Sequence, residues 1–123
     1  MKTILAGAAL LLAGCSQNQQ GTLTCPVPQS GAMQGSLPES PAQIALGGQR
    51  LCRGSENEIA ELAAALRARH PGVSTGAIVN YMVTAYCPVI NRRADLHAAA
   101  KAKALSGFAS RADHIVAATR QAS

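Results

Sequence analysis

The sequence contains no tryptophan, and its aromatic side chains number only three: Tyr81, Tyr86 and Phe108. Proteins that bind nucleic acids commonly combine cationic side chains with aromatic side chains on which the bases stack. The shortage of aromatic residues therefore disfavours a nucleic-acid partner, and it leaves small aliphatic side chains to build the core. Acidic residues are also few, six against eleven Lys and Arg. A mildly basic surface suits anionic neighbours, although such residues also simply solvate helix surfaces.

Several short motifs of enzymes and metal proteins are absent. The chain has no S-x-x-K, no phosphate-binding Gly-rich loop, no C-x-x-C and no C-x-x-C-H. Structural zinc sites use closely spaced ligand pairs, and the cysteines here lie far apart along the chain. We therefore expect no catalytic residue, no metal and no cofactor, and we expect the protein not to be an enzyme.

The N-terminus has the features of an export signal. Lys2 supplies a positive charge, and residues 4–13 form a short apolar run. A membrane-spanning helix needs roughly 20 apolar residues, about twice this length. The pattern is typical of a secretory signal that is removed after export. It ends in Leu12, Ala13, Gly14 and Cys15, followed by a polar stretch.

These four residues resemble the lipobox of bacterial lipoproteins. The resemblance implies that residues 1–14 are a lipoprotein signal peptide, that Cys15 receives diacylglycerol on its sulfur, and that its new amino group is acylated, typically with palmitate. Ser16 stands where lipoproteins retained at the inner membrane tend to have Asp. The resemblance thus implies a protein anchored by Cys15 in the outer membrane, facing the periplasm.

Residues 15–40 are rich in Gln, Ser, Gly and Pro and show no apolar period. This composition predicts a flexible tether. Residues 41–123 carry helical patterns and form the expected domain. A domain of this size buries little surface and is marginally stable without additional support.

Four segments of the domain favour helices. Ser40 and Pro41 can begin the first, although Gly47 and Gly48 weaken it and Gly54 can end it. Ser55 and Glu58 form a capping-box pattern for the second, which ends at Pro71 and Gly72. We predict a third that Ser74 or Thr75 caps and Pro88 ends, and a fourth that Asp95 caps and that breaks or kinks at Gly107. The expected fold is all-α, a small bundle of three to four short helices behind the tether.

With Cys15 carrying lipid, Cys25, Cys52 and Cys87 remain. Exported proteins favour disulfides, and three cysteines allow three single pairings: 25–52, 25–87 and 52–87. We predict Cys52–Cys87, because both lie within the expected domain and Cys25 lies in the tether. A loop of about 35 residues would stabilise the fold by roughly 3–4 kcal/mol in the chain-entropy model. Cys25 is then free or paired with another chain.

We expect a non-catalytic protein that binds or scaffolds within the bacterial envelope, with an envelope protein or an anionic cell-wall component as partner. Arg92 and Arg93 form a local basic pair that is a candidate anion contact. One alternative is a periplasmic metal or thiol-redox carrier using Cys52 and Cys87, with Cys25 or a histidine as an optional further ligand. A second is a small hydrolase or its accessory subunit, which would need a cleft with perturbed acids.

Overall fold

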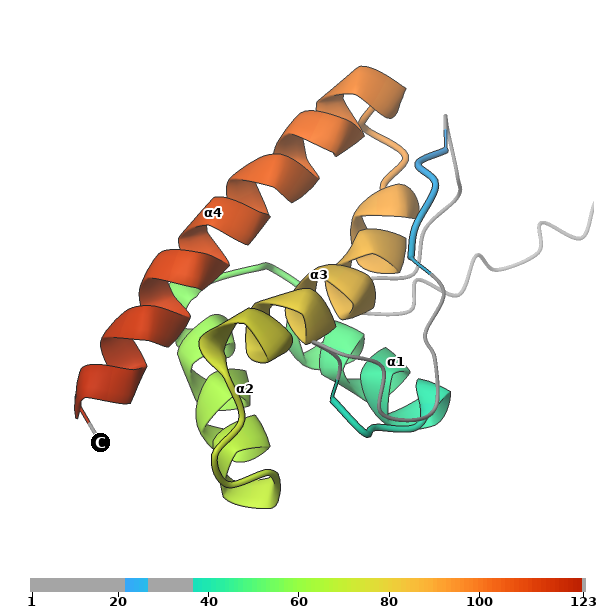
Figure 1. Cartoon of the computed structure of the whole chain (residues 1–123). Coiled ribbons are helices and arrows are strands. Elements are labelled where there is room, and N and C mark those ends of the chain that lie inside the picture. The colour runs from blue at the N-terminus through green and yellow to red at the C-terminus, as the bar shows by residue number, and fades with distance from the viewer. Residues whose placement is uncertain (1–21, 27–36, 123) are drawn as a thin grey trace, which may run out of the picture.

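The computed structural model describes residues 22–26 and 37–122 (Figure 1). These residues form four helices and no strand. The helices are α1 (Pro41–Arg50), α2 (Glu56–Arg69), α3 (Thr75–Asn91) and α4 (Ala98–Ala122). The expected all-α class is confirmed. Among the residues described, no helix combines the length and the apolar character that crossing a membrane requires.

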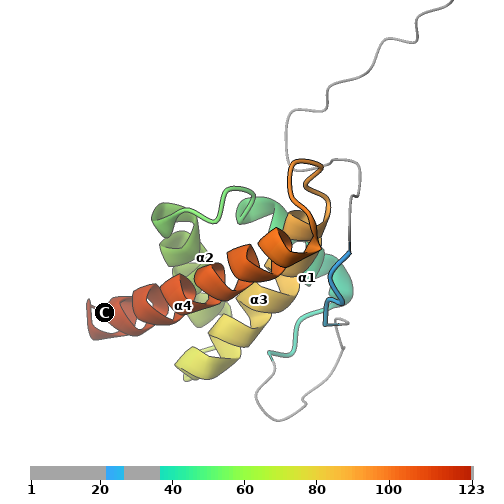
Figure 2. The same ribbon diagram turned by 90° about the horizontal axis from the view of Figure 1, so that it is seen from above.

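Helix α3 lies at the centre of the bundle. It packs most extensively against α4 and α1, while α2 packs mainly against α4 (Figures 1 and 2). Nine of its 17 residues are buried, so its apolar face is wide. The apolar pairs Ile78–Val79 and Met82–Val83 produce this width. Residues four apart lie on the same side of a helix, whereas the two members of each pair lie on different sides, so the pairs together widen the apolar face. Other elements must therefore cover α3 on several sides.

Three serines cap helices as the sequence predicts. The hydroxyl oxygens of Ser40, Ser55 and Ser74 accept hydrogen bonds from backbone N–H groups three residues ahead, at 3.1–3.2 Å. The carboxylate of Glu58 completes a capping box by accepting from the backbone N–H of Ser55 at 3.0 Å. Such caps satisfy donors that a helix start leaves unpaired.

The two glycines of α1 have a packing role. A Cβ atom on Gly48 would lie 2.4 Å from the carbonyl oxygen of Ala85, and one on Gly47 would lie 2.6 Å from the hydroxyl oxygen of Tyr81. Glycine at these positions lets the backbone of α1 approach α3 closely. The low helix propensity of the pair, roughly 1 kcal/mol for each glycine, is offset by this packing and by the burial of Ile44.

The prediction that Pro88 ends the third helix is wrong. Helix α3 continues through Pro88 to Asn91. A proline inside a helix costs about 3 kcal/mol, but Val89 and Ile90 are buried beyond it, and each contributes roughly 1.5–3 kcal/mol. Lys101 also supports the helix end, since its Nζ donates to the carbonyl oxygen of Asn91 at 2.6 Å.

Helix α4 begins at Ala98, later than the predicted cap at Asp95. The Nδ1 of His97 accepts from the backbone N–H of Ala100 at 3.2 Å, while Asp95 pairs with Arg93. Gly107 does not interrupt the helix, because the neighbouring Phe108 is fully buried and holds that turn against the core.

Parts of the segment predicted as a tether are fastened to the bundle. The backbone of Leu23 exchanges two hydrogen bonds with the side chain of Asn91, at 2.8 and 3.2 Å. Leu37 and Glu39 are almost completely buried. Single apolar residues such as Leu23 and Leu37 produce no periodic pattern in a sequence. The polar composition of residues 15–40 was therefore the only signal, and it indicated flexibility. A single flexible tether over 15–40 is therefore wrong for 22–26 and 37–40, whereas residues 15–21 and 27–36 lie outside the described residues.

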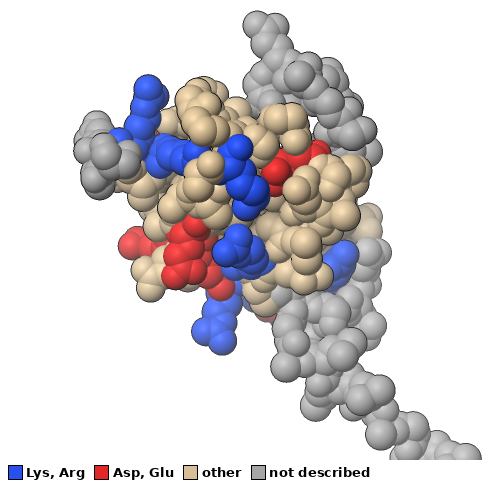
Figure 3. Space-filling model, turned by 90° about the horizontal axis from the view of Figure 1, so that it is seen from below, with Lys and Arg blue, Asp and Glu red and all other residues tan. Residues whose placement is uncertain are grey.

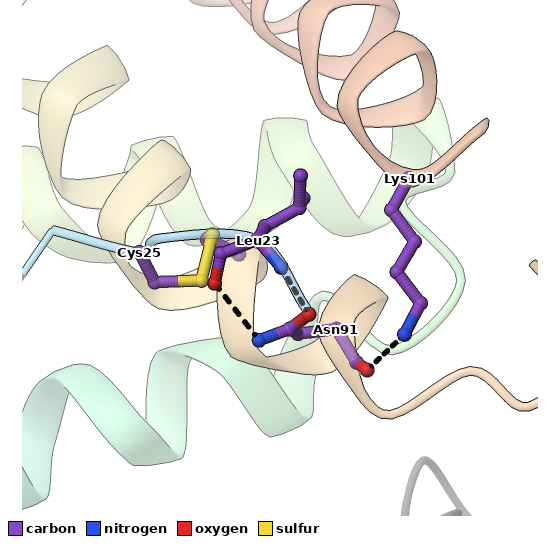
Figure 4. The surroundings of a disulfide bond; sticks show 5 residues. Leu23, Cys25, Asn91 and Lys101 are labelled. Atoms are coloured by element: carbon purple, nitrogen blue, oxygen red, sulfur yellow. Dashed lines mark hydrogen bonds between the residues drawn. A yellow bond between two sulfur atoms is a disulfide. The ribbon is translucent and has the colours of Figure 1, made fainter. Parts of the chain in front are cut away.

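A disulfide joins Cys25 to Cys87 across a sequence separation of 62 (Figure 4). The expectation of a disulfide-stapled bundle is confirmed, and the predicted pairing of Cys52 with Cys87 is wrong. The Leu23–Asn91 hydrogen bonds place Cys25 beside the buried Cys87. Cys52 is half-buried in the turn after α1 and is not a free thiol. Cys15, for which the sequence predicts lipidation, lies outside the described residues.

We expect Gly48→Ala to destabilise the protein by about 1–3 kcal/mol, because the added methyl group meets backbone that cannot rotate away. Gly107→Ala is the matched control. It lies in a helix with open space around its Cβ position, and it should stabilise the protein by roughly 0.5–1 kcal/mol. Urea unfolding measures both, and a neutral Gly48→Ala would contradict the close crossing of α1 and α3.

Removing the disulfide with Cys25→Ser and Cys87→Ala together should lower the free energy of unfolding by about 4 kcal/mol, the chain-entropy value for a loop of this length. Urea unfolding of oxidised wild type and the double variant measures the loss. Peptide mapping without reduction should recover Cys25 joined to Cys87. A fragment that joins Cys52 to Cys87 would instead restore the original prediction.

Candidate functional site

A groove with a volume of about 460 Å³ lies where α1, α2 and α3 meet. We call it the α1–α2 groove. Its lining comes from α1 (Gln43, Leu46, Gly47, Gln49, Arg50), from α2 (Leu62, Arg69) and from α3 (Tyr81). The volume falls within the range of about 300–1,000 Å³ that is typical of small-molecule sites. The groove is therefore the first candidate for binding.

Apolar groups form part of the groove. Leu62 and Tyr81 are almost fully buried, and Leu46 is 58% exposed. Leu46 is the one large hydrophobic side chain that is exposed among the described residues. A single exposed leucine is ordinary on a protein surface. Here it stands beside a hollow with a buried apolar base, so a ligand can contact both.

Two arginines line the groove, and they differ in their partners. Arg69 donates from Nη2 to the carboxylate of Glu39 at 2.9 Å. The side chain of Arg50 is exposed and makes no hydrogen bond or ion pair with any described residue. All six acidic side chains of the chain lie within residues 37–122, so none of them neutralises Arg50. The groove therefore carries one uncompensated positive charge.

Glu39 holds the chain before α1 against the end of α2. Its side chain is 2% exposed, and it accepts from Arg69 and from Nε2 of His70 at 2.8 Å. An ionised carboxylate only accepts, so Nε2 of His70 carries the proton in this contact. Burial raises the pKa of Glu39, but the hydrogen bonds and charges of Arg69 and His70 outweigh it, and the net pKa is lowered. We call this cluster the Glu39 latch.

Tyr81 connects the latch to the groove. Its hydroxyl donates to the carbonyl oxygen of Gln43 at 3.0 Å. Burial, followed by the negative charge of Glu39, raises the pKa of Tyr81 to about 12, while Arg69 and Arg50 act in the opposite direction. The phenol thus stays protonated at neutral pH. It fixes α1 on α3 and offers no base for catalysis.

The cationic residues of the chain are spread over its surface. On the face shown in Figure 3, Lys and Arg side chains are interrupted by groups of acidic ones. The predicted pair lies outside the α1–α2 groove. Arg92 and Arg93 are both exposed, and Arg93 donates twice to Asp95, at 3.1 and 2.6 Å. The pairing raises the pKa of Arg93 and lowers that of Asp95. An anion contact here would depend on Arg92.

Two of the three cysteines of the alternative metal or thiol-redox carrier are not available as thiols. Cys25 and Cys87 are bonded to each other, and Cys87 is fully buried. Within residues 22–26 and 37–122, no group of three or more His, Cys, Asp or Glu side chains is placed to hold a metal ion. No observation here favours the carrier over a binding protein.

A second, more open hollow of about 530 Å³ includes Ser74 and His70. Residues 72–76 read Gly-Val-Ser-Thr-Gly, a G-x-S-x-G pattern. In hydrolases this pattern forms a strained turn from a strand to a helix. Here no strand precedes it, the Ser74 hydroxyl caps α3, and no hydrogen bond joins Ser74 to His70. The serine is explained as a helix cap.

Comparison with known proteins assigns no family to this chain. No protein-family model matches it, no curated protein matches its sequence, and no solved structure matches it. The Glu39 latch, which sequence reasoning missed, had one detectable signal: a lone acidic residue within a stretch otherwise free of charge, residues 16–49.

We expect Glu39→Gln to destabilise the protein by about 1–2 kcal/mol at pH 7, because it weakens two charge-assisted hydrogen bonds. Partial exposure of Arg69 keeps the value low. Since folding lowers the pKa of Glu39, its contribution is complete above about pH 4.5 and disappears as the pH falls through the lower folded value. The difference between wild type and variant should therefore shrink below pH 4.5.

Urea unfolding at pH 7 and pH 3 measures this difference. Glu61→Gln is the matched control, because Glu61 is exposed on α2, and its removal should have little effect at either pH. An equal loss of stability for Glu39→Gln at both pH values would contradict an ionised latch.

Proposed function

We propose that this protein is a lipid-anchored, non-catalytic binding or scaffolding protein of the bacterial envelope, held at the periplasmic face of the outer membrane. The observation that carries the proposal is the N-terminal sequence. Lys2 and a short apolar run precede Leu12-Ala13-Gly14-Cys15, and the lipobox-like end places a cysteine where lipoproteins attach their lipid. Two or three acyl chains on Cys15 provide a stable anchor, since one chain alone binds membranes only marginally.

The disulfide supports export. Disulfides persist in oxidising compartments such as the periplasm and are rare in the cytosol. Cys25 is bonded to Cys87 and so fastens the chain to α3. Cys15 and Cys25 are only ten positions apart in the sequence, which allows at most about 35 Å between the lipid and the bundle. The domain is therefore held close to the membrane surface and not on a long tether.

The groove chemistry supports binding over catalysis. Among the described residues, its lining contains Arg, Gln, Leu, Gly and Tyr, but no Ser, Thr or Cys nucleophile and no His or carboxylate base. Catalysis of hydrolysis needs such a group within hydrogen-bond reach of the reacting atoms. Guanidinium and amide groups next to apolar side chains instead suit recognition. The partner we propose is an envelope protein or an anionic cell-wall component.

Cys15→Ala should abolish incorporation of labelled palmitate and release the protein from the membrane fraction. The intact mass of wild type should correspond to residues 15–123 plus diacylglycerol and one acyl chain. Cys25→Ser is the matched control and should keep both lipid and membrane association. A wild-type chain that carries no lipid would contradict the anchor.

Two further results test the rest of the proposal. Ser16→Asp should move the lipidated protein from the outer to the inner membrane on a density gradient. Turnover of p-nitrophenyl esters by the purified wild type, lost in Ser74→Ala, would show a hydrolase and contradict the non-catalytic role.

A further inference from the structure

The unpaired charge of Arg50 limits what the α1–α2 groove can bind. Arg69 is neutralised by Glu39, so the groove has a local charge of one positive unit. A carboxylate, with one negative charge, balances it. A phosphate monoester carries about −1.5 to −2 at neutral pH and would leave an excess. The charge therefore favours a carboxylate.

Arg69 is held ready for such a ligand. Its Nη2 is fixed by the buried Glu39, and the side chain remains 41% exposed. A guanidinium has five N–H donors in a rigid plane, and a single carboxylate contact leaves donors for a second acceptor. Because the Glu39 latch has already ordered this side chain, binding loses less conformational entropy.

The other groups of the groove suit a short peptide. Gln43 and Gln49 are exposed on α1 and offer amide donors and acceptors of the kind that pair with a peptide backbone. Leu46 and the buried Leu62 offer apolar contact for a small side chain. The volume of about 460 Å³ accommodates only a few residues.

We propose that the α1–α2 groove binds the free carboxyl terminus of a peptide that ends in small apolar residues, with the carboxylate between Arg50 and Arg69. The terminal side chain lies against Leu46 and Leu62, and the amides of Gln43 and Gln49 face the peptide bond. This inference deepens the binding role proposed above and rests on it.

The test uses the purified mature chain, with detergent where lipid is attached, and two probes: acetyl-Ala-Ala with a free carboxylate, and its C-terminal amide. Calorimetry should show that the acid binds at least tenfold more tightly than the amide, because only the acid offers a charged acceptor to the guanidinium groups. Arg50→Gln should weaken binding of the acid roughly tenfold. Leu46→Ala should weaken both probes.

Arg53→Gln is the matched control. It removes the same charge from an exposed arginine outside the groove lining, and it should change affinity less than about twofold. Because Arg50 and Arg53 are both exposed, the unfolding midpoints of both variants should match wild type. Equal effects of the two substitutions would indicate unspecific attraction and overturn the proposal.

Two other results would also overturn it. One is the absence of binding, or equal binding of acid and amide. The other is inorganic phosphate that displaces the peptide at a lower concentration than acetate does. These failures can be distinguished from failure of the anchor. If the wild type incorporates palmitate but binds no peptide, only the peptide-binding inference is overturned. If it binds peptide but carries no lipid, only the anchor is overturned.

Discussion

The burial of α3 is the constraint on which the rest of the bundle depends. A chain with three aromatic residues has few large side chains with which to cover so wide an apolar helix. It covers α3 instead by close approach. Gly48 brings the α1 backbone against Ala85, the α4 side chain of Phe108 packs onto Tyr86 with ring centroids 4.2 Å apart, and Cys25 ties a short extended stretch to Cys87. Together these contacts cover α3 on several sides.

The same close packing creates the groove. Because Gly47 lacks a side chain, Tyr81 reaches α1 and donates to the carbonyl oxygen of Gln43. The tyrosine occupies the space that a larger residue at position 47 would need, and it lines the groove together with Leu46 and Arg69. The glycine pair thus serves stability and shape together, which explains why a helix keeps two residues that its own propensity disfavours.

Local features of this fold were predictable from sequence, and contacts between distant residues were not. The serine caps depend on hydrogen bonds between residues three positions apart, so the local pattern at Ser55 and Glu58 is enough to predict the helix start. The extent of α3 beyond Pro88 depends on burial by other helices, which no local rule includes. Lys101 is similar: it occupies an apolar line of α4 because the carbonyl oxygen of Asn91 lies within its reach, ten residues away in sequence. The Cys25–Cys87 disulfide was not predicted for the same reason, because Cys25 is brought to Cys87 by contacts between residues that are distant in the sequence.

Local charge, more than net charge, decides what such a protein recognises. A basic domain is attracted to any anionic surface, and that attraction has no chemical selectivity and weakens with salt. In the Glu39 latch, the carboxylate of Glu39 neutralises the charge of Arg69 and holds its guanidinium group in place. Only Arg50 then remains to be balanced in the groove. A ligand of the proposed site would gain by matching one charge at a defined position, which a membrane surface does not do.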